Sequence, residues 1–401
     1  MKKILLIMPY GSVGGMERLA LHFYNHYKSQ GYQVTAIKFF KLQSDIINFK
    51  QDEYALLNKD LSELSPFKRL WFYMSAPFKL RRLIKKQHIT HSIAFGDMAN
   101  IFSALTNTSE FKIGSIHALK SVELNSHSMF TRIIKWSYKS IYKKLHKVVC
   151  ISNAIKKDLI ENCQYKFPEN LEVIYNPHDI TSIQSLSEEP LDTPKERALF
   201  KGQTIIFIGR LSYQKSPWHL INAFKLLIEK NENVNLIFIG DGNPEVIQYI
   251  KNQIETFNIK DRIHFLGRKT NPYKYLKQAD VLALSSHFEG TPNVIVEAIT
   301  LGIPIVCSNC TEGIMELMSI NKYSENNKNI HVESGIITPN FYKGTLGFPE
   351  YNGLTLEEEH FSEALLQVLL DSSFKIILNK NRKALLKKFA IELSAENYLN
   401  N

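Results

Sequence analysis

Short apolar runs alternate with longer amphipathic stretches through most of the 401-residue chain. Runs of four to six residues rich in Val, Ile and Phe are typical of strands buried on both faces, and the stretches between them are typical of helices. This alternation predicts an α/β fold with parallel sheets covered by helices. The ten predicted strands are residues 2–9, 32–40, 88–96, 111–118 and 146–152, and then residues 203–210, 234–242, 262–268, 280–286 and 303–309.

The two groups of strands predict two doubly wound, Rossmann-like domains that face a central cleft. A polar, proline-bearing segment at residues 177–202 has no periodicity and is predicted to be a linker. The first domain is therefore placed at residues 1–180 and the second at 200–385, with helices at 217–229 and 245–257. A C-terminal helix from about residue 385 is expected to pack back on the first domain, and the Asn/Lys-rich residues 321–329 are predicted to be a surface insertion.

The composition, 44% hydrophobic and 22% charged, is that of a globular protein. The apolar run at residues 4–8 is shorter than the core of a signal peptide, and no later run approaches the length of a membrane span. Four cysteines do not make a disulfide framework, so we expect a soluble, cytoplasmic protein. Cys307 and Cys310 form a C-x-x-C, for which packing and metal binding are both open, and packing is favoured because no second Cys/His pair stands at ligand spacing.

Charge is distributed unevenly along the chain. Residues 1–180 contain 26 Lys+Arg and 14 Asp+Glu, whereas the remainder contains 23 and 25. The stretches 66–88 and 131–147 carry seven and six basic residues, no acid, and interleaved aromatic residues. They predict helices that lie on an anionic membrane surface. The alternative for each stretch is a solvated basic face with an aromatic stripe in the core, and the alternative for the whole chain is a non-catalytic, basic membrane- or nucleic-acid-binding protein.

The first loop, "PYGSVGGMER", does not fit a dinucleotide-binding fingerprint. Counting G-x-G-x-x-G from Gly11, the next two glycine positions hold Val13 and Met16, and the second strand ends in lysines where an acid would bind ribose. Glycines at a helix start still let backbone amides approach an anion. As a lone glycine-rich turn, this loop is weak evidence.

The second half carries more specific candidates. Arg210 follows a predicted strand and Lys215 precedes a helix, so both cations would lie where a diphosphate could be bound. Thr291 is a suitable N-cap and Pro292 suits the first helical position, which predicts a helix whose amides could bind a phosphate. Glu289 lies just before that helix, and Glu297 stands in an otherwise apolar run within it. Two carboxylates flanking a phosphate site suit a nucleotide-diphosphate sugar, one binding the sugar and the other the ribose.

These motifs resemble the nucleotide-sugar-binding domain of glycosyltransferase family 4, which has the GT-B fold. The matching features, in order over residues 204–312, are "GRL…QK", "IGDG", "FLGR", "E-G-x-x-N-V-x-x-E-A" and "LGIPIV". The first half resembles the acceptor domain through "GGMER", "SIHALKS", "VVCISNAIKKDL" and "VIYNP". Gly-Thr-Pro after Glu289 departs from the common Gly-Phe-Gly, which indicates a different donor-sugar pocket.

The resemblance implies a role for each matching residue. Glu289, His117, Arg210 and Lys215 would be catalytic, with the two cations on the diphosphate and Glu289 and His117 on the donor sugar. Glu297 would bind the ribose, Arg268 would lie by the nucleobase and Gly15 by the phosphates or the acceptor. The full donor-binding set would be Gly15, Gly209, Arg210, Lys215, Arg268, Glu289, Gly290, Thr291, Pro292, Asn293, Val294 and Glu297.

The expected function is a retaining transfer of sugar from a nucleotide-diphosphate sugar, UDP being the commonest, to a saccharide or lipid-linked acceptor in bacterial surface polysaccharide or glycoconjugate biosynthesis. We expect no metal and no other cofactor, because no metal-ligand cluster stands out in the sequence. The expected partners are the donor, the acceptor and an anionic membrane, with no nucleic acid. The expected location is the cytoplasmic face of the membrane.

Overall fold

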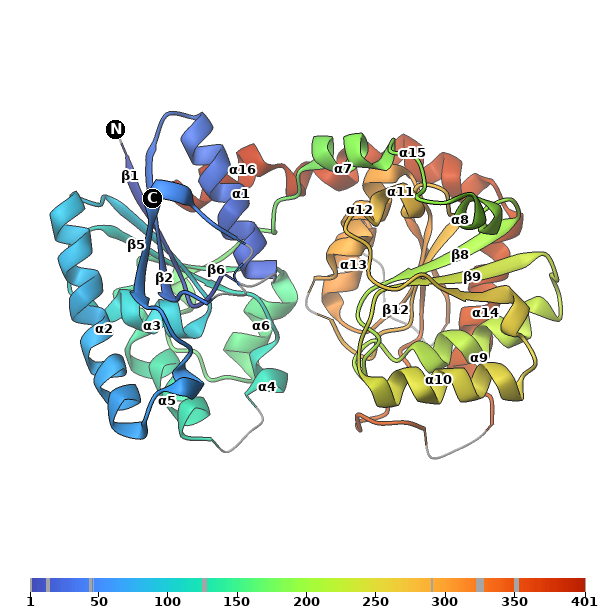
Figure 1. Ribbon diagram of the computed structural model, residues 1–401, viewed down its shortest axis with the longest axis horizontal. Helices are drawn as coiled ribbons and strands as arrows, with labels where there is room; N and C mark the ends of the chain where they lie inside the picture. Colours follow the sequence, from blue (N-terminus) through green and yellow to red (C-terminus); the bar gives the residue numbers. More distant parts are fainter. Residues whose placement is uncertain are drawn as a thin grey trace. The chain divides into compact units, whose positions relative to one another are not determined.

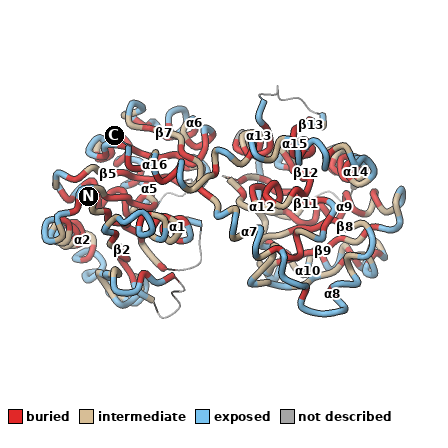
Figure 2. The backbone as a smooth tube through the Cα atoms, turned by 90° about the horizontal axis from the view of Figure 1, so that it is seen from above, coloured by how far each residue is buried: buried red, intermediate tan, exposed pale blue. Residues whose placement is uncertain are grey.

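The computed structural model of the chain describes all residues except 1, 12–14, 43–44, 46, 125–127, 290, 322–327, 350–352 and 401. The chain forms two compact units: residues 1–178 together with 388–401, and residues 179–387 (Figure 1). Each unit is built on its own sheet of seven strands. In both units the strands are mostly buried and the outer helix faces are exposed (Figure 2). Each unit is described by itself below.

The first unit has an all-parallel sheet in the order β3-β2-β1-β4-β5-β6-β7. In the central strand, Ile4 lies beside Val34 of one neighbouring strand and His91 of the other; Ile4 and Val34 are buried, and His91 is half-buried. The strands are β1 (Lys3–Met8), β2 (Gln33–Phe40), β3 (Glu53–Leu57), β4 (His91–Phe95), β5 (Phe111–Ile116), β6 (Lys147–Cys150) and β7 (Leu171–Val173).

Helices cover both faces of this sheet. One face packs against α2, α3, α5 and α6, whose inner residues share one core cluster with alternate residues of β1 and β2. The other face packs against α1 and α16. The helices are α1 (Gly15–Ser29), α2 (Pro66–Gln87), α3 (Asp97–Leu105), α4 (Lys120–Glu123), α5 (Met129–Ser140), α6 (Asn153–Glu161) and α16 (Ile391–Leu399).

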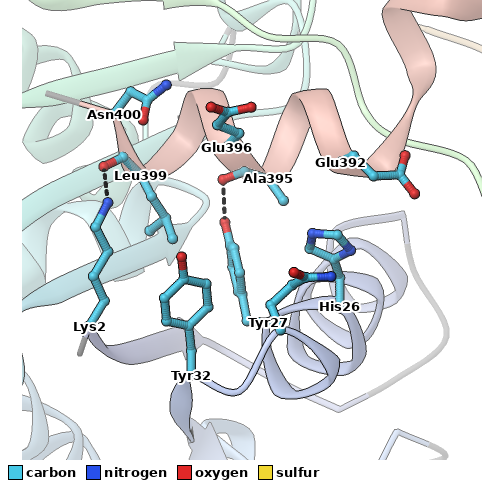
Figure 3. A pocket seen from close by; sticks show the side chains of 10 residues that line it. Lys2, His26, Tyr27, Tyr32, Glu392, Ala395, Glu396, Leu399 and Asn400 are labelled. Atoms are coloured by element: carbon cyan, nitrogen blue, oxygen red, sulfur yellow. Dashed lines mark hydrogen bonds between the residues drawn. The ribbon is translucent and has the colours of Figure 1, made fainter.

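The C-terminal helix α16 is bound to the first unit by side chains that reach its backbone. Tyr27 of α1 donates to the Ala395 carbonyl at 2.9 Å, and the Lys2 ammonium donates to the Leu399 carbonyl at 2.9 Å (Figure 3). Burial raises the pKa of the Tyr27 hydroxyl well above its ordinary value, so it stays a donor at neutral pH. Lys, placed at helix-end carbonyls, also complements the negative end of the helix dipole.

The second unit has the sheet order β10-β9-β8-β11-β12-β14-β13, parallel except for the hairpin of β13 and β14. The strands are β8 (Gln203–Ile208), β9 (Val234–Ile239), β10 (Ile263–Phe265), β11 (Val281–Leu284), β12 (Ile305–Ser308), β13 (Ile330–Val332) and β14 (Gly335–Thr338). The helices are α7 (Ile180–Ser187), α8 (Pro194–Leu199), α9 (Pro217–Ile228), α10 (Pro244–Thr256), α11 (Tyr273–Leu276), α12 (Asn293–Leu301), α13 (Glu312–Met318), α14 (Leu356–Leu370) and α15 (Ser373–Leu386).

These two parallel-sheet units confirm the predicted doubly wound α/β class, and each of the ten predicted strands contains an observed one. The prediction that residues 177–202 form an irregular linker is wrong. This segment holds α7 and α8, both of which belong to the second unit. Asp179 caps α7 by accepting from the Ser182 amide, and Thr193 and Glu196 form a reciprocal capping box on α8. Of the predicted insertion, residues 322–327 lie outside the described residues.

Among the helices that the structure describes, none is both long enough and apolar enough to cross a bilayer.

Candidate functional site

In each sheet the chain reverses its winding direction beside the central strand. β1 pairs with β2 on one side and β4 on the other, and β8 pairs in the same way with β9 and β11. Doubly wound sheets bind ligands at the carboxyl ends of the strands at such a reversal. In the second unit this point brings together the loops after β8, residues 209–216, and after β11, residues 285–292. Of the predicted site residues of the second unit that the structure describes, all except Arg268, Asn293, Val294 and Glu297 lie on one of these two loops.

Glycines after β9 let the first of these loops continue in register beyond the sheet. A Cβ on Gly240 would lie 2.0 Å from the Gly209 carbonyl oxygen, and a Cβ on Gly242 would lie 2.0 Å from that of Leu211. Both contacts are with backbone, which cannot move aside. The "IGDG" motif therefore holds two strand ends in close contact, and the loop leaves Arg210 exposed beyond β8.

The two loops are joined by reciprocal hydrogen bonds. The Ser216 hydroxyl donates to the Ser285 carbonyl at 2.5 Å, and the Ser285 hydroxyl bonds the Ser216 carbonyl at 3.1 Å. Ser216 holds φ 37°, a left-handed conformation that is unfavourable for serine and that these bonds help to stabilise. The His287 amide donates to the Gln214 carbonyl at 2.8 Å. Lys215 is therefore fixed against the second loop.

Lys215 and Glu289 form an ion pair between the two loops. The Glu289 side chain is 10% exposed and that of Lys215 is 16% exposed, so both charges are largely removed from water. Ser286 donates a further hydrogen bond to Glu289 at 2.9 Å. Gly209 lies next to this pair, because a Cβ on Gly209 would be 3.6 Å from Cε of Lys215. The carboxylate thus neutralises the lysine that was predicted to bind a diphosphate.

A chain of buried polar side chains supports the second loop from below. His219 of α9 bonds Glu358 of α14 through Nδ1 at 2.7 Å, and its Nε2 lies 3.1 Å from Nε2 of His287. Asn222 donates to the same Glu358 oxygen at 2.8 Å. The other carboxylate oxygen of Glu358 accepts the Thr355 amide at 2.9 Å, which completes a capping box on α14. One carboxylate therefore caps α14 and anchors the Glu289 loop.

The two histidine rings of this chain meet through their Nε2 atoms. The Glu358 carboxylate accepts from His219 Nδ1–H, and one of the two Nε2 atoms donates to the other. Nδ1 of His287 has no partner among the described residues. Burial, with a smaller electrostatic contribution from the neighbouring His219, lowers the pKa of His287 to about 4. His287 is thus neutral at physiological pH.

The helix after the second loop begins later than predicted. α12 starts at Asn293, and Pro292, with ψ 111°, holds the N-cap position without a side-chain cap bond. The prediction that Thr291 is the N-cap is therefore wrong. A residue before proline is driven to extended conformations, which keeps Thr291 outside the helix. Val294 is buried under the first turn. Gly290 lies outside the described residues.

Glu297 and Arg268 lie apart from the Lys215–Glu289 pair in the contacts they make. Glu297 is half-buried on α12, four residues beyond its start, and accepts a hydrogen bond from the Tyr273 hydroxyl at 3.4 Å. Arg268 is exposed just after β10, next to Gly267, which holds φ 66° and whose carbonyl accepts the Gly240 amide at 2.9 Å. The β10 loop is thereby tied to the β9 loop.

Two predicted residues belong to the first unit. His117 follows β5, and its Nε2 lies 2.8 Å from the Ser115 hydroxyl, which itself donates to the Ala94 carbonyl. Nε2 is therefore the donor, and Nδ1 is an acceptor without a partner among the described residues. Burial, together with the charge of Lys120, lowers the pKa of His117 to about 3, so the ring is neutral. Gly15 is the first residue of α1, and no described atom would contact a Cβ there, so packing does not require glycine.

Described residues of the first unit also line cavities of about 330 and 350 Å³ at the amino-terminal ends of its strands. The first is lined by Lys2, Tyr32 and residues of α1 and α16 (Figure 3), and the second by Lys3, Gln33 and the end of α2. Strand starts lie at the edge of the sheet opposite to the one where this fold binds ligands. Neither cavity is a candidate for the same chemistry.

Sequence reasoning missed the residues that hold the candidate site in place. Ser286 and His287 stand just before the E-x7-E stretch, which begins at Glu289, but nothing local shows that their side chains bond Glu289 and His219. Glu358 lies 139 residues after His219, and only the fold brings them together. Cys307 and Cys310 are buried free thiols.

Two protein-family models match the chain in sequence. Residues 13–182 match the model described as Glycosyltransferase Family 4, and residues 192–334 match the model described as Glycosyl transferases group 1. The matches fall one on each structural unit, apart from a few residues at their boundary. Together the two models match both units of the chain, which belongs to the family 4 glycosyltransferases and has the GT-B fold.

Relatives in sequence agree with this assignment, and solved structures agree with the fold. An uncharacterized glycosyltransferase of Methanocaldococcus jannaschii is 29% identical over 63% of this chain and 63% of its own length. The Escherichia coli UDP-Gal:alpha-D-GlcNAc-diphosphoundecaprenol alpha-1,3-galactosyltransferase is 28% identical over 59% of this chain and 62% of its own. The chain thus spans under two thirds of either relative. The crystal structure of Anabaena HepE in complex with UDP and glucose superposes with a TM-score of 0.70, covering 99% of this chain and 98% of that one at 18% identity.

Proposed function

We propose that this enzyme transfers a sugar, with retention of anomeric configuration, from a nucleotide-diphosphate sugar to a saccharide or lipid-linked saccharide. The observation that carries the proposal is the Lys215–Glu289 ion pair, held by two interlocked loops at the winding reversal of the second sheet. It offers one cation for a diphosphate and one carboxylate for sugar hydroxyls at a single point. UDP is the proposed nucleotide, supported by the names of the Escherichia coli relative and of the HepE complex.

The chief catalytic task would be to stabilise the departing diphosphate. Lys215 and the exposed Arg210 would meet its charge, together with the first amides of α12. Preorganised donors are effective here because they need no rearrangement as charge develops. We propose that these groups suffice and that activity needs no divalent cation.

The remaining predicted residues would bind and orient the donor. Glu289 would accept hydrogen bonds from sugar hydroxyls, and Glu297 from the ribose. His117, a neutral ring whose Nδ1 is an acceptor, would accept from a hydroxyl of the donor sugar. Gly15, Gly209 and Arg268 would lie by the phosphates and the nucleobase.

The proposed chemistry is a substitution at the anomeric carbon on the face from which the diphosphate leaves. The acceptor hydroxyl oxygen forms the new bond to that carbon as its bond to the phosphate oxygen breaks. The hydroxyl proton passes to the departing phosphate oxygen, so no enzyme carboxylate has to act as nucleophile. Retention follows because attack and departure occur on the same face.

The proposed acceptor is a saccharide on a membrane lipid, used at the cytoplasmic face of the membrane for surface polysaccharide or glycoconjugate synthesis. The support is the diphosphoundecaprenol acceptor in the name of the Escherichia coli relative. Nucleic acid is not a proposed partner.

The test is a transfer assay with UDP-sugars and a saccharide linked to polyprenyl diphosphate, with the anomeric configuration of the product read by NMR. We expect a product that keeps the donor configuration, and loss of its formation in Lys215→Met. Lys230→Met, an exposed lysine after α9, is the matched control and should retain activity. A product of inverted configuration, or equal activity in both variants, would contradict the proposal.

A further inference from the structure

The helix α2 has two apolar faces, only one of which is used by the fold. Phe72, Ala76 and Leu80 are buried in the core of the first unit. Successive residues of a helix are rotated by about 100°, so Phe67, five residues before Phe72, and Met74, two residues after it, lie on the opposite side of the helix. That opposite side carries five large apolar residues that are between 55% and 78% exposed: Phe67, Leu70, Trp71, Met74 and Phe78.

The same exposed stripe becomes basic toward the end of α2. Arg82, Lys85 and Lys86 are exposed, and Arg82 and Lys85 continue the angular position of Trp71 and Phe78. The ammonium of Lys79 lies 5.0 Å from the centre of the Trp71 ring. Asp and Glu do not occur anywhere in α2.

The helix α5 repeats this arrangement on a smaller scale. Its inner residues Ile134 and Tyr138 are buried in the core. Met129, Ile133 and Trp136 on its outer face and Phe130 in its first turn are between 42% and 79% exposed, beside the exposed basic residues Arg132, Lys135 and Lys139. It too contains no acid.

The two exposed faces point away from the sheet on the same side. The inner residues Phe72 and Leu80 of α2 and Ile134 and Tyr138 of α5 belong to one core cluster on one face of the sheet. The short helix α3 packs against α2 and is largely buried, and its Asp97 accepts a hydrogen bond from Tyr138 of α5 at 2.7 Å. Figure 1 shows α2, α3 and α5 along one side of the first unit. We call the exposed faces of α2 and α5 together the α2–α5 surface.

We propose that the α2–α5 surface docks on an anionic lipid bilayer, with its aromatic residues inserted at the headgroup level and its basic residues on lipid phosphates. A soluble monomer rarely exposes apolar groups in this density, and aromatic residues ringed by Lys and Arg match the interface of an anionic membrane. A second copy of the chain fits poorly, because two surfaces with basic residues and no acid would repel each other. The inference deepens the proposed function, since a lipid-linked acceptor lies in a membrane, but its test uses neither donor nor acceptor.

The positions of the tryptophans make the test direct. Of the three in the chain, Trp71 and Trp136 are 55% and 58% exposed on the α2–α5 surface, and Trp218 is fully buried in the second unit. Adding phosphatidylcholine vesicles with 30% phosphatidylglycerol should shift the emission to shorter wavelength, and lipids brominated on their chains should quench it. Pure phosphatidylcholine vesicles should do neither. The Trp71→Phe/Trp136→Phe variant, in which only Trp218 emits, should still bind vesicles but show no shift.

Sedimentation with the same vesicles separates specific docking from the attraction of a basic protein. Arg82→Glu/Lys85→Glu/Lys86→Glu should weaken vesicle binding on the order of 100-fold, because each of the three basic residues contributes about 1 kcal/mol, or about fivefold in affinity. Phe67→Ser/Trp71→Ser/Phe78→Ser should weaken it at least tenfold without changing charge. The control Lys230→Glu/Lys251→Glu/Lys260→Glu makes the same charge change at exposed positions of the second unit and should bind as wild type.

Three outcomes would overturn the inference. If the serine variant binds vesicles as wild type does, the aromatic residues do not insert. If the control variant loses binding equally, the attraction is not a property of this surface. Preference for single-stranded nucleic acid over anionic vesicles would assign the surface to a different partner. A failure to transfer sugar, with vesicle binding intact, would count against the proposed function only.

Discussion

Replacing Glu289 by Gln should strengthen binding of a nucleoside diphosphate while it slows sugar transfer. In the structure Glu289 holds the ammonium of Lys215, so an incoming diphosphate has to compete with a carboxylate for that cation. Gln keeps the size of the side chain and an oxygen that can accept from Ser286. It removes only the charge, and Lys215 becomes free to bind phosphate.

The expected size of both effects follows from the burial of the pair. Exposed ion pairs contribute about 0 to 1 kcal/mol, and buried pairs cost about 3 to 5 kcal/mol when one partner is removed. With side chains 16% and 10% exposed and an amide left in place of the carboxylate, we expect about 1 kcal/mol, or roughly fivefold tighter diphosphate binding. Loss of a charged hydrogen bond to the sugar, about 1.5 to 3 kcal/mol, should lower kcat roughly ten- to a hundredfold.

Calorimetry with UDP and steady-state kinetics with the full donor measure the two effects separately. Glu297→Gln is the matched variant: it should weaken both UDP and UDP-sugar, because the ribose is common to them. The reasoning is refuted if both glutamate variants lose UDP affinity to the same extent while their melting temperatures match that of wild type.

Three further predictions concern the fold and the chemistry of the site. Gly240→Ala should destabilise the protein by several kcal/mol, because the new Cβ would meet the Gly209 carbonyl. Gly267→Ala, also at positive φ but without a contact within 4 Å, should cost about 1 kcal/mol. Urea unfolding of both variants measures the difference, and equal losses would contradict the steric argument. The pKa of His287 is held at about 4, below the ordinary value near 6.5, so on acidification the unfolded chain takes up a proton before the folded one does. The neutral ring therefore contributes up to about 3 kcal/mol to the free energy of unfolding above pH 6.5, and this contribution is lost as the pH falls toward 4. His287→Asn should flatten that decline in urea titrations between pH 4 and 7, and an unchanged slope would show that His287 is not its source. Finally, sugar transfer should survive EDTA, and complete loss that Mg²⁺ or Mn²⁺ restores would show that the cationic side chains do not suffice.

Strand prediction succeeded where burial left a strong pattern. Parallel strands covered on both faces need continuous apolar runs, and all ten such runs became strands. Three of the strands that were missed lack this signal: β3 is half-exposed at the edge of its sheet, and β7 and β13 have only three residues each. The fourth, β14, is a short buried run, Gly335–Thr338, that carries the signal and was not predicted.

The segment between the two units shows a different limit. Its apolar periodicity is too weak to predict helices, yet the capping residues of α8 were readable as Thr193-Pro194-x-Glu196. Local signals mark where a helix can begin. Whether it forms depends on the surface it packs against, here α11 and α12 for α7.

For the candidate site, the sequence located the loops but not their contacts. Lys215 and Glu289 were predicted on separate loops for separate parts of a donor, and the structure places their side chains in contact with each other. The support from Glu358 through His219 joins residues far apart in the chain and has no local pattern. The roles of these residues toward a donor stay predictions.

The most direct test of the central claim is a thermal-shift panel of nucleoside diphosphates and nucleotide sugars on wild type, Lys215→Met and the Lys230→Met control. Ligand binding to the native state raises the melting temperature by mass action. We expect one nucleoside diphosphate and its sugar conjugates to raise the melting temperature of wild type and Lys230→Met, with most of the shift lost in Lys215→Met. A panel without any shift, or a shift that Lys215→Met retains in full, would contradict the assignment of a nucleotide-sugar site to the loops after β8 and β11.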